Sequence, residues 1–186
     1  MTIDLSIVIP CYNEEDRLPR TLTATLSYLR ARTGQYEIVV VSDGSKDRTK
    51  DVAEMVFKTL PKNIVTRVIE YTPNGGKGKA LKVGMQEAQG DQVLFMDADY
   101  AVPLEYLPPA ELLLKQGVDI AIGSRAVKGT QVLEHQSFIR EKMSKVFGLI
   151  QRNYLGLKLL DTQCGFKAFK QPVKRAHLSS HAGVSI

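Results

Sequence analysis

Hydrophobic and polar residues follow a repeating pattern along the first two thirds of the chain. The short apolar run at residues 5–9 is typical of a strand buried on both faces, and further strands are predicted at 36–41, 64–71, 92–96 and 118–122. Between these runs, apolar residues recur at steps of three and four, which predicts helices at 18–32, from Ser45 or Asp47 to about 60, 77–89 and 104–116. Repeated strand–helix units predict an α/β fold, with a Rossmann-like, mostly parallel sheet and helices on both faces.

The loops that follow the predicted strands hold the candidate chemistry, because ligands of such sheets bind at the carboxyl ends of the strands. Asp97 and Asp99 follow the fourth strand directly. In extended backbone, residues two apart point to the same side, so two carboxylates would face one spot. Oxygen ligands of this kind favour Mg²⁺ or Mn²⁺, which can act as a Lewis acid for a diphosphate. The alternative is that one of the two aspartates caps the following helix.

Two other loops carry polar residues at strand ends. Asp43 lies at the end of the second strand, where its carboxylate could accept hydrogen bonds from a nucleobase or a ribose. The segment Asn74-Gly-Gly-Lys-Gly-Lys79 resembles a phosphate-binding loop, although it is not a Walker A motif. Its glycines allow close backbone approach, and Lys77 and Lys79 offer positive charge. A flexible loop with incidental lysines explains the same residues equally well.

Composition limits the class of protein. The 186 residues are 44% hydrophobic and 24% charged, as expected for one globular domain with a buried core. No apolar run reaches the roughly 18 residues that a membrane span needs, and no signal peptide is recognisable. Cys11 and Cys164 are far apart in the sequence, so we expect reduced thiols in a cytosolic setting, with Cys164 a small buried residue.

The positive charge of the chain is concentrated near its C-terminal end. Net charge is +5, and residues 124–175 alone hold eleven basic and three acidic residues. Within this stretch, residues 138–158 predict a basic amphipathic helix, which would either pack on the sheet or lie on a membrane surface. Arg125, after the fifth strand, and Arg140, at the start of this helix, are candidate phosphate ligands because arginine binds phosphate bidentately. Such charge predicts an anionic partner unless it is simply a solvated face.

Six motifs, taken together and in order, resemble those of family 2 glycosyltransferases, which have the GT-A fold. Three match signatures of the family at large: Ile9-Pro-Cys-Tyr-Asn-Glu14, Ser42-Asp-Gly-Ser-x-Asp-x-Thr49 and Asp97-Ala-Asp99. Three more resemble the branch that contains dolichyl-phosphate β-glucosyltransferases: Asn74-x-Gly-Lys-Gly78, Gly123-Ser-Arg125 and Asp161-Thr-Gln-Cys-Gly-Phe-Lys167. The resemblance spans about residues 3–170, so we expect a catalytic domain at 1–170 and an irregular tail at 171–186.

The resemblance implies an inverting transfer of a hexose, here glucose from UDP-glucose, to a polyprenyl or dolichyl phosphate. It assigns the acceptor phosphate to Arg125 and Arg140, and it places Asp161 near the reacting centre. It assigns the metal, Mg²⁺ or Mn²⁺, to Asp97 and Asp99. The residues implied to bind the nucleotide sugar are Pro10, Tyr12, Glu14, Asp43, Lys77, Asp97 and Asp99. It also implies a cytoplasmic protein with peripheral membrane contact through residues 138–158 and no nucleic-acid partner.

The sequence departs from the family pattern in two respects, and two other functions remain open. Ala101 stands where some relatives have a third metal-site residue, and relatives continue well past Phe169, often into transmembrane helices. One alternative is a soluble glycosyltransferase acting on a sugar hydroxyl in polysaccharide synthesis, which would not need a basic helix. The other is a nucleotide-sugar-binding remnant without turnover, which the short C-terminal part favours.

Overall fold

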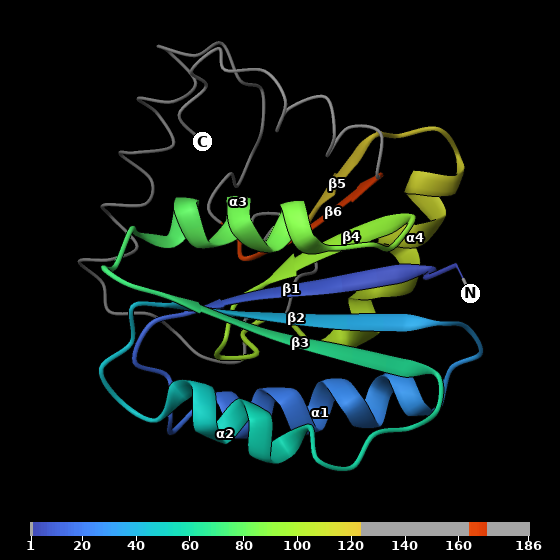
Figure 1. The fold of residues 1–186 in the computed structure, drawn as a ribbon. Coiled ribbons are helices and arrows are strands. Elements are labelled where there is room, and N and C mark those ends of the chain that lie inside the picture. Colours follow the sequence, from blue (N-terminus) through green and yellow to red (C-terminus); the bar gives the residue numbers. More distant parts are fainter. Residues whose placement is uncertain (1, 124–163, 171–186) are drawn as a thin grey trace, which may run out of the picture.

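The computed structural model describes residues 2–123 and 164–170, and every structural statement below concerns these residues. Six strands and four helices are present in this part of the chain, together with a 3₁₀ turn (Figure 1). The strands are β1 (Leu5–Cys11), β2 (Tyr36–Asp43), β3 (Ile64–Tyr71), β4 (Gln92–Met96), β5 (Ile120–Ile122) and β6 (Phe166–Lys170). The helical elements are α1 (Leu18–Arg30), α2 (Thr49–Val56), α3 (Lys77–Glu87), η1 (Leu104–Tyr106) and α4 (Leu107–Lys115).

The strands form one sheet in the order β3-β2-β1-β4-β6-β5. β1 pairs in parallel with both β2 and β4, and β3 pairs in parallel with β2. β6 lies antiparallel between β4 and β5, although it comes from a distant part of the chain (Figure 1). The predicted α/β fold with a mostly parallel sheet is therefore confirmed. The direction of β6 was not predicted, because hydrophobic periodicity carries no information about the neighbours of a strand.

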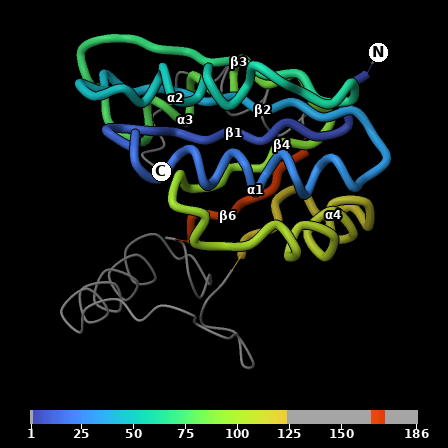
Figure 2. The backbone as a smooth tube through the Cα atoms, turned by 90° about the horizontal axis from the view of Figure 1, so that it is seen from below, coloured from blue at the N-terminus to red at the C-terminus, as the bar shows by residue number. Residues whose placement is uncertain are grey.

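Helices cover both faces of the sheet, as predicted (Figures 1 and 2). α1, α2 and α4 pack on one face, where leucines such as Leu22 and Leu114 join the larger of two hydrophobic clusters. α3 packs on the other face, against a smaller cluster that includes Val8 and Val41. A Cβ atom on Gly84 would come within 2.4 Å of the Val8 side chain. The missing side chain at Gly84 thus lets α3 lie close to the sheet.

Several element boundaries differ from the predicted ones. α1 ends at Arg30, α2 ends at Val56, and β5 begins only at Ile120. The predicted helix 104–116 is divided into η1 and α4, and both prolines of this segment lie in the first turn of α4. Proline lacks a backbone N–H, which a residue in a helix interior needs. It fits in the first turn because N–H groups there have no acceptor within the helix.

A buried network of hydrogen bonds lies at the edge of the sheet where the parallel strands begin. Glu37 is only 1% exposed, and its carboxylate accepts hydrogen bonds from the Ser6 hydroxyl and from the N–H of Gln89 at 2.8 Å. The N–H of Gly90 donates to the Ser6 hydroxyl at 2.7 Å, and Arg67 approaches Glu37 to 3.7 Å. This network ties the turn between α3 and β4 to β1 and β2. It lies at the edge opposite the candidate site.

Some predictions concern residues that the structure does not describe. The basic helix at 138–158 and the tail at 171–186 lie outside the described residues. The proposed division at residue 170 therefore stays a prediction. Within residues 2–123 and 164–170, no helix combines the length and the apolar character needed to cross a bilayer.

Candidate functional site

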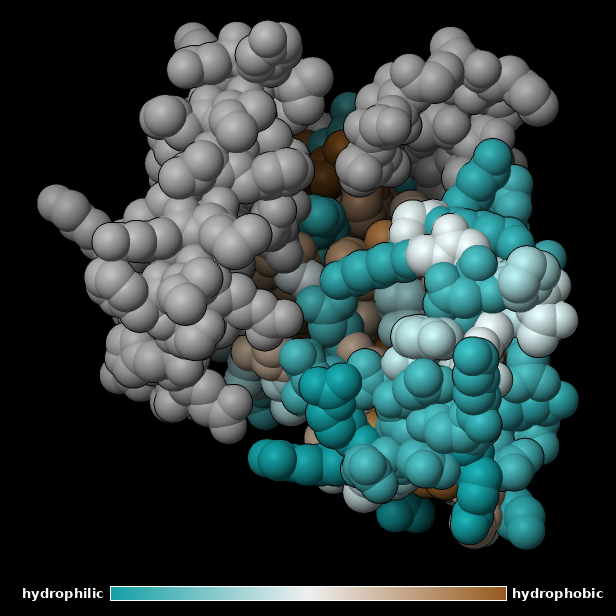
Figure 3. Space-filling view, turned by 90° about the vertical axis from the view of Figure 1, so that its left-hand side faces the viewer, coloured by the Kyte–Doolittle hydropathy of each residue, from teal (hydrophilic) through white to brown (hydrophobic). Residues whose placement is uncertain are grey.

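The carboxyl ends of β1, β2, β3 and β4 meet at one edge of the sheet, and the first group of predicted site residues lies there. Pro10 is paired with Val41, and Asp43 is paired with Tyr71. Side chains two apart on a strand share a face, and Val41 packs under α3, so Asp43 and Tyr71 lie on the α3 face. Figure 3 looks onto this edge and shows that its described surface is mainly hydrophilic. The loops after β1, β2, β3 and β4, which the sequence analysis selected, therefore lie at one edge of the sheet.

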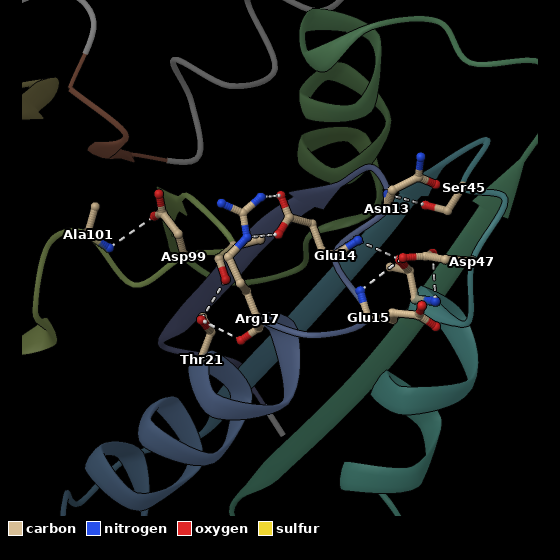
Figure 4. A network of polar contacts seen from close by, with 11 residues as sticks. Asn13, Glu14, Glu15, Arg17, Thr21, Ser45, Asp47, Asp99 and Ala101 are labelled. Carbon is tan, nitrogen blue, oxygen red and sulfur yellow. Dashed lines mark hydrogen bonds and ion pairs between the residues drawn. The ribbon is translucent and has the colours of Figure 1, made fainter. Parts of the chain in front are cut away.

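Hydrogen bonds to Asp47 connect the loop after β1 with the loop after β2 (Figure 4). Its carboxylate accepts hydrogen bonds from the N–H of Glu15 at 3.0 Å, from the N–H of Thr49 at 3.0 Å, and from the Thr49 hydroxyl. The Thr49 hydroxyl in turn accepts a bond from the N–H of Glu14 at 2.8 Å. Burial alone would raise the pKa of Asp47, but the hydrogen bonds from Thr49 and Glu15 outweigh it and lower that pKa.

Asn13 makes a second connection between the same two loops. Its backbone N–H donates to the Ser45 hydroxyl at 3.2 Å, and its side-chain oxygen accepts from the N–H of Lys46 at 2.8 Å. Asn13 has a positive φ of 54°, a conformation that asparagine tolerates better than most residues. Sequence reasoning matched both motifs but missed their mutual contacts. The signal was the repeated use of Asn, Asp, Ser and Thr, whose side chains bond nearby backbone in turns.

Tyr12 and Glu14 stand at the rim of this edge. The Tyr12 side chain is 45% exposed. The Glu14 carboxylate binds Arg17 through two hydrogen bonds of 2.7 and 2.8 Å (Figure 4). Glu14 is therefore engaged within its own loop, and its predicted contact with a nucleoside stays a prediction.

Asp43 organises the glycine-rich loop that precedes α3. It is 3% exposed, and its Oδ1 accepts the N–H of Gly75 at 2.7 Å. Its backbone carbonyl accepts the side-chain amide of Asn74 at 2.8 Å. Gly44 has a φ of 66°, and a Cβ atom there would lie 2.5 Å from the backbone nitrogen of Asn74. Glycine at this position therefore allows the loop to lie directly against the end of β2.

Lys77, the first residue of α3, forms an ion pair with Asp97 at 2.6 Å. Its ammonium group also lies 5.2 Å from the centre of the Phe95 ring. The N–H of Asp97 donates to the carbonyl of Gly165 at 3.2 Å. A Cβ atom on Gly165 would come within 1.8 Å of the Asp97 carboxylate, so any larger residue here would require that carboxylate to move. Asp97 and Gly165, which are 68 residues apart in sequence, are therefore in contact.

Asp99 does not continue the strand. β4 ends at Met96, and residues 98 and 99 form a turn in which the carbonyl of Ala98 accepts the Thr21 hydroxyl at 2.6 Å. Asp99 is exposed, and its Oδ1 accepts the N–H of Ala101 at 3.0 Å. The extended-backbone argument for Asp97 and Asp99 was therefore wrong. The helix-capping alternative was also wrong, because the residue before η1 is Pro103.

The carboxylates that the structure describes at this edge are chemically suitable ligands for Mg²⁺ or Mn²⁺, but they are too few to complete a metal site. In the two described ranges, no group of three or more His, Cys, Asp or Glu side chains could hold a metal ion. One oxygen of Asp97 is held by Lys77, and one oxygen of Asp99 by its own turn. Carboxylate oxygens match Mg²⁺ and Mn²⁺, which commonly take further oxygens from substrate phosphates. The metal ligands Asp97 and Asp99 stay a prediction.

Arg125, Arg140 and Asp161 lie outside the described residues, but the two ends of that stretch are fixed. The N–H of Gly123 donates to the carbonyl of Phe166 at 2.9 Å, and Cys164 is buried, as predicted. A Cβ atom on Gly123 would lie 3.2 Å from the Cys164 sulfur. Gly123 and the segment 164–166 therefore lie side by side, and Gly165 in that segment contacts Asp97.

The fold and this edge define the class of protein as an α/β domain of the GT-A type. The chain belongs to glycosyl transferase family 2, whose pattern matches residues 6–177. It is 37% identical to a dolichyl-phosphate beta-glucosyltransferase from Drosophila melanogaster, over 96% of this chain and 58% of the relative. It is 31% identical to an undecaprenyl-phosphate 4-deoxy-4-formamido-L-arabinose transferase from Pectobacterium atrosepticum, over 96% of this chain and 52% of the relative. The chain thus spans little more than half the length of these relatives.

A solved structure shows the same fold. Glucosyl-3-phosphoglycerate synthase from Mycobacterium tuberculosis, in complex with Mn²⁺, UDP-glucose and phosphoglyceric acid, superposes with a TM-score of 0.65 at 20% identity. The match covers 92% of this chain and 57% of that chain. The sequence-based assignment to family 2 and to the GT-A fold is confirmed.

Proposed function

We propose that this chain is the donor-binding and transfer domain of a glycosyltransferase that moves glucose from UDP-glucose to a polyprenyl phosphate. The observation that carries the proposal is the convergence of Asp43, Lys77 and Asp97 at one strand edge in a member of family 2. Two relatives are named for transfer to dolichyl or undecaprenyl phosphate, which supports a lipid phosphate as the acceptor.

The donor diphosphate fits best at the amino-terminal end of α3. Backbone N–H groups and the helix dipole favour an anion there, and Lys77 adds a positive charge. Lys77 Nζ forms an ion pair with Asp97 at 2.6 Å. When bound, Mg²⁺ or Mn²⁺ supplies Lewis-acid stabilisation of the departing UDP, and Asp97 and Asp99 are the residues to hold it. Pro10, Tyr12 and Asp43 would surround the nucleoside.

The acceptor needs positive charge more than it needs a base. A phosphate monoester is already an anion at pH 7, so its oxygen can attack the anomeric carbon while the bond to UDP breaks and its electron pair leaves with UDP. Repulsion between the two phosphate groups must be overcome, and we assign this role to Arg125 and Arg140. Asp161 would position the acceptor. The anchoring of Gly123 and Cys164 beside Asp97 supports these assignments, since both ends of that stretch start from the donor edge.

A polyprenyl phosphate is a membrane lipid, so we propose peripheral contact with the cytoplasmic face of a membrane through residues 138–158. Flotation of the full chain with liposomes tests this contact. We expect binding to anionic vesicles that weakens with salt. Equal binding to neutral and anionic vesicles would contradict it.

Transfer of labelled sugar tests the function itself. The full chain is incubated with UDP-glucose or other nucleotide sugars and a short polyprenyl phosphate, with Asp97→Asn as the inactive variant and the exposed Asp91→Asn as the matched control. We expect glucose transfer to the lipid phosphate that Asp97→Asn abolishes. Transfer only to a sugar hydroxyl would replace the lipid acceptor, and donor binding without transfer to any acceptor would identify a remnant. Failure to bind every nucleotide sugar would refute the proposal.

A further inference from the structure

α1 contains three threonines, and their hydroxyl groups do not all bond in the same way. Thr23 and Thr25 donate to the carbonyl four residues earlier, each at 2.8 Å, which is a common bond for threonine within a helix. The Thr21 hydroxyl is 3.4 Å from the equivalent carbonyl, that of Arg17, and only 2.6 Å from the carbonyl of Ala98. It therefore donates out of the helix, to the turn that follows β4 (Figure 4).

Ala98, which accepts this bond, stands between the two aspartates that are the proposed metal ligands. Both partners of the bond lie inside the protein, since Thr21 is 1% exposed and Ala98 is 5% exposed. A buried carbonyl that loses its donor is costly, so the bond holds the Ala98 peptide in one position. Because Asp97 and Asp99 are the immediate neighbours of Ala98, the same bond restricts where their side chains start.

The backbone of this turn needs support from other segments. Tyr100 has a φ of 56°, a left-handed conformation that is unfavourable for a bulky side chain. Strain of this kind persists only where surrounding contacts hold the backbone in place, and it is often found at functional sites. Gly165 accepts the N–H of Asp97 at 3.2 Å on one side of the turn, and Thr21 donates to the turn from α1. The Thr21 hydroxyl is therefore one of the contacts that maintain the strained conformation.

We propose that Thr21 is a positioning residue for the divalent cation of the donor site. Its hydroxyl acts through the Ala98 carbonyl and keeps Asp97 and Asp99 in place for that cation. This inference rests on the proposed function, because the cation belongs to the proposed donor site. Replacing a residue that orients metal ligands typically lowers metal affinity about 10- to 100-fold, even though the residue does not touch the metal.

Calorimetric titration of the full chain with UDP, once with Mn²⁺ and once with EDTA, tests the inference. The measured quantity is the factor by which Mn²⁺ tightens UDP binding. Thr21→Val removes the hydroxyl at nearly constant size, and Thr21→Ser keeps it. Thr25→Val is the matched control, because Thr25 is equally buried in the same helix and its hydroxyl bonds a carbonyl of that helix.

The expected result is a loss that depends on the metal. We expect the Mn²⁺ factor of Thr21→Val to be about tenfold or more below that of the wild type. Thr21→Ser and Thr25→Val should keep the wild-type factor. In EDTA, every variant should bind UDP with an affinity close to that of the wild type, because the effect of Thr21 is transmitted through the cation. Thermal unfolding identifies any variant that does not fold, and Thr21→Ala, which removes the same hydroxyl without placing a methyl group against the Ala98 carbonyl, then replaces Thr21→Val.

The contrary outcomes separate this inference from the proposed function. An unchanged Mn²⁺ factor in Thr21→Val would overturn the inference and leave the donor site standing. An equal loss in Thr25→Val would also overturn it, because the loss would then be a general effect of α1 on the fold. If Mn²⁺ does not tighten UDP binding to the wild type, the metal assignment in the proposed function fails, and this inference fails with it.

Discussion

Replacement of Asp47 by asparagine tests how the two loops at the strand ends are held together. Asp47 uses one oxygen for Thr49 and the other for the N–H of Glu15. An asparagine of the same shape keeps one acceptor, but its amide nitrogen must then face a donor. If the oxygen stays on Thr49, the bond to Glu15 is lost and two N–H groups oppose each other.

The expected cost follows from these contacts. A hydrogen bond to a charged group contributes about 1.5–3 kcal/mol, and the half-buried position of Asp47 screens it, so we expect a loss of about 1–2 kcal/mol. For a protein of this size, that corresponds to a melting temperature roughly 3–6 °C lower. The loop that carries Tyr12 would also become less ordered. UDP binding must then order this loop at a cost in binding free energy. We therefore expect UDP affinity to fall about 3- to 10-fold.

The pH dependence gives the most specific test. The folded protein lowers the pKa of Asp47 from its ordinary value of 3.8. Its stabilisation is therefore complete above that value and is lost as the pH falls through the lower, folded-state pKa. Urea unfolding of wild type, Asp47→Asn and the exposed Asp91→Asn should show a difference only for Asp47→Asn at pH 7. That difference should narrow below about pH 3.8. Equal urea midpoints at pH 7, or a difference independent of pH, would refute the reasoning.

Three further predictions concern other contacts. Gly165→Ala places a Cβ atom where the Asp97 carboxylate lies, so we expect UDP-glucose affinity to fall more than about tenfold in a titration, whereas unchanged affinity would contradict the close packing. Glu37→Ala leaves the O–H of Ser6 and the N–H of Gln89 without an acceptor, and we expect a loss of about 3 kcal/mol in urea unfolding. The site lies at the opposite edge, so near-wild-type UDP affinity in the folded variant is the accompanying expectation. UDP-glucose with Mn²⁺ should raise the melting temperature of the wild type, and Asp99→Ala should abolish that shift; an equal shift in the variant would exclude Asp99 as a ligand.

The sequence predicted the sheet correctly where local pattern was sufficient. β1, β2 and β4 are mainly apolar strands that are buried on both faces, and the alternation of strands with helices follows from the sequence pattern. Glycines and prolines indicated the loops but not their lengths, so α2 and β5 are shorter than predicted. Capping, turns and tertiary packing decide where a helix or strand ends. The spacing of hydrophobic residues along the sequence carries little information about these boundaries.

Asp97 and Asp99 show the same limit at the site. Sequence reasoning correctly placed Asp97 at a strand end, but the extension through Asp99 was wrong. The turn there is stabilised by Thr21, which lies in a different helix and 77 residues earlier. A pattern along the chain cannot reveal such a partner.

The sequence by itself determined the fold class, the family and the edge of the sheet where chemistry is concentrated. These depend on hydrophobic period and on short motifs, which are local properties of the chain. Only the tertiary structure showed that Asp47 joins two loops, that Gly165 touches Asp97, and that Tyr71 lies beside Asp43. Each of these contacts joins residues from separate segments. Which segments become neighbours is decided by sheet order and by packing, and therefore by the whole chain at once.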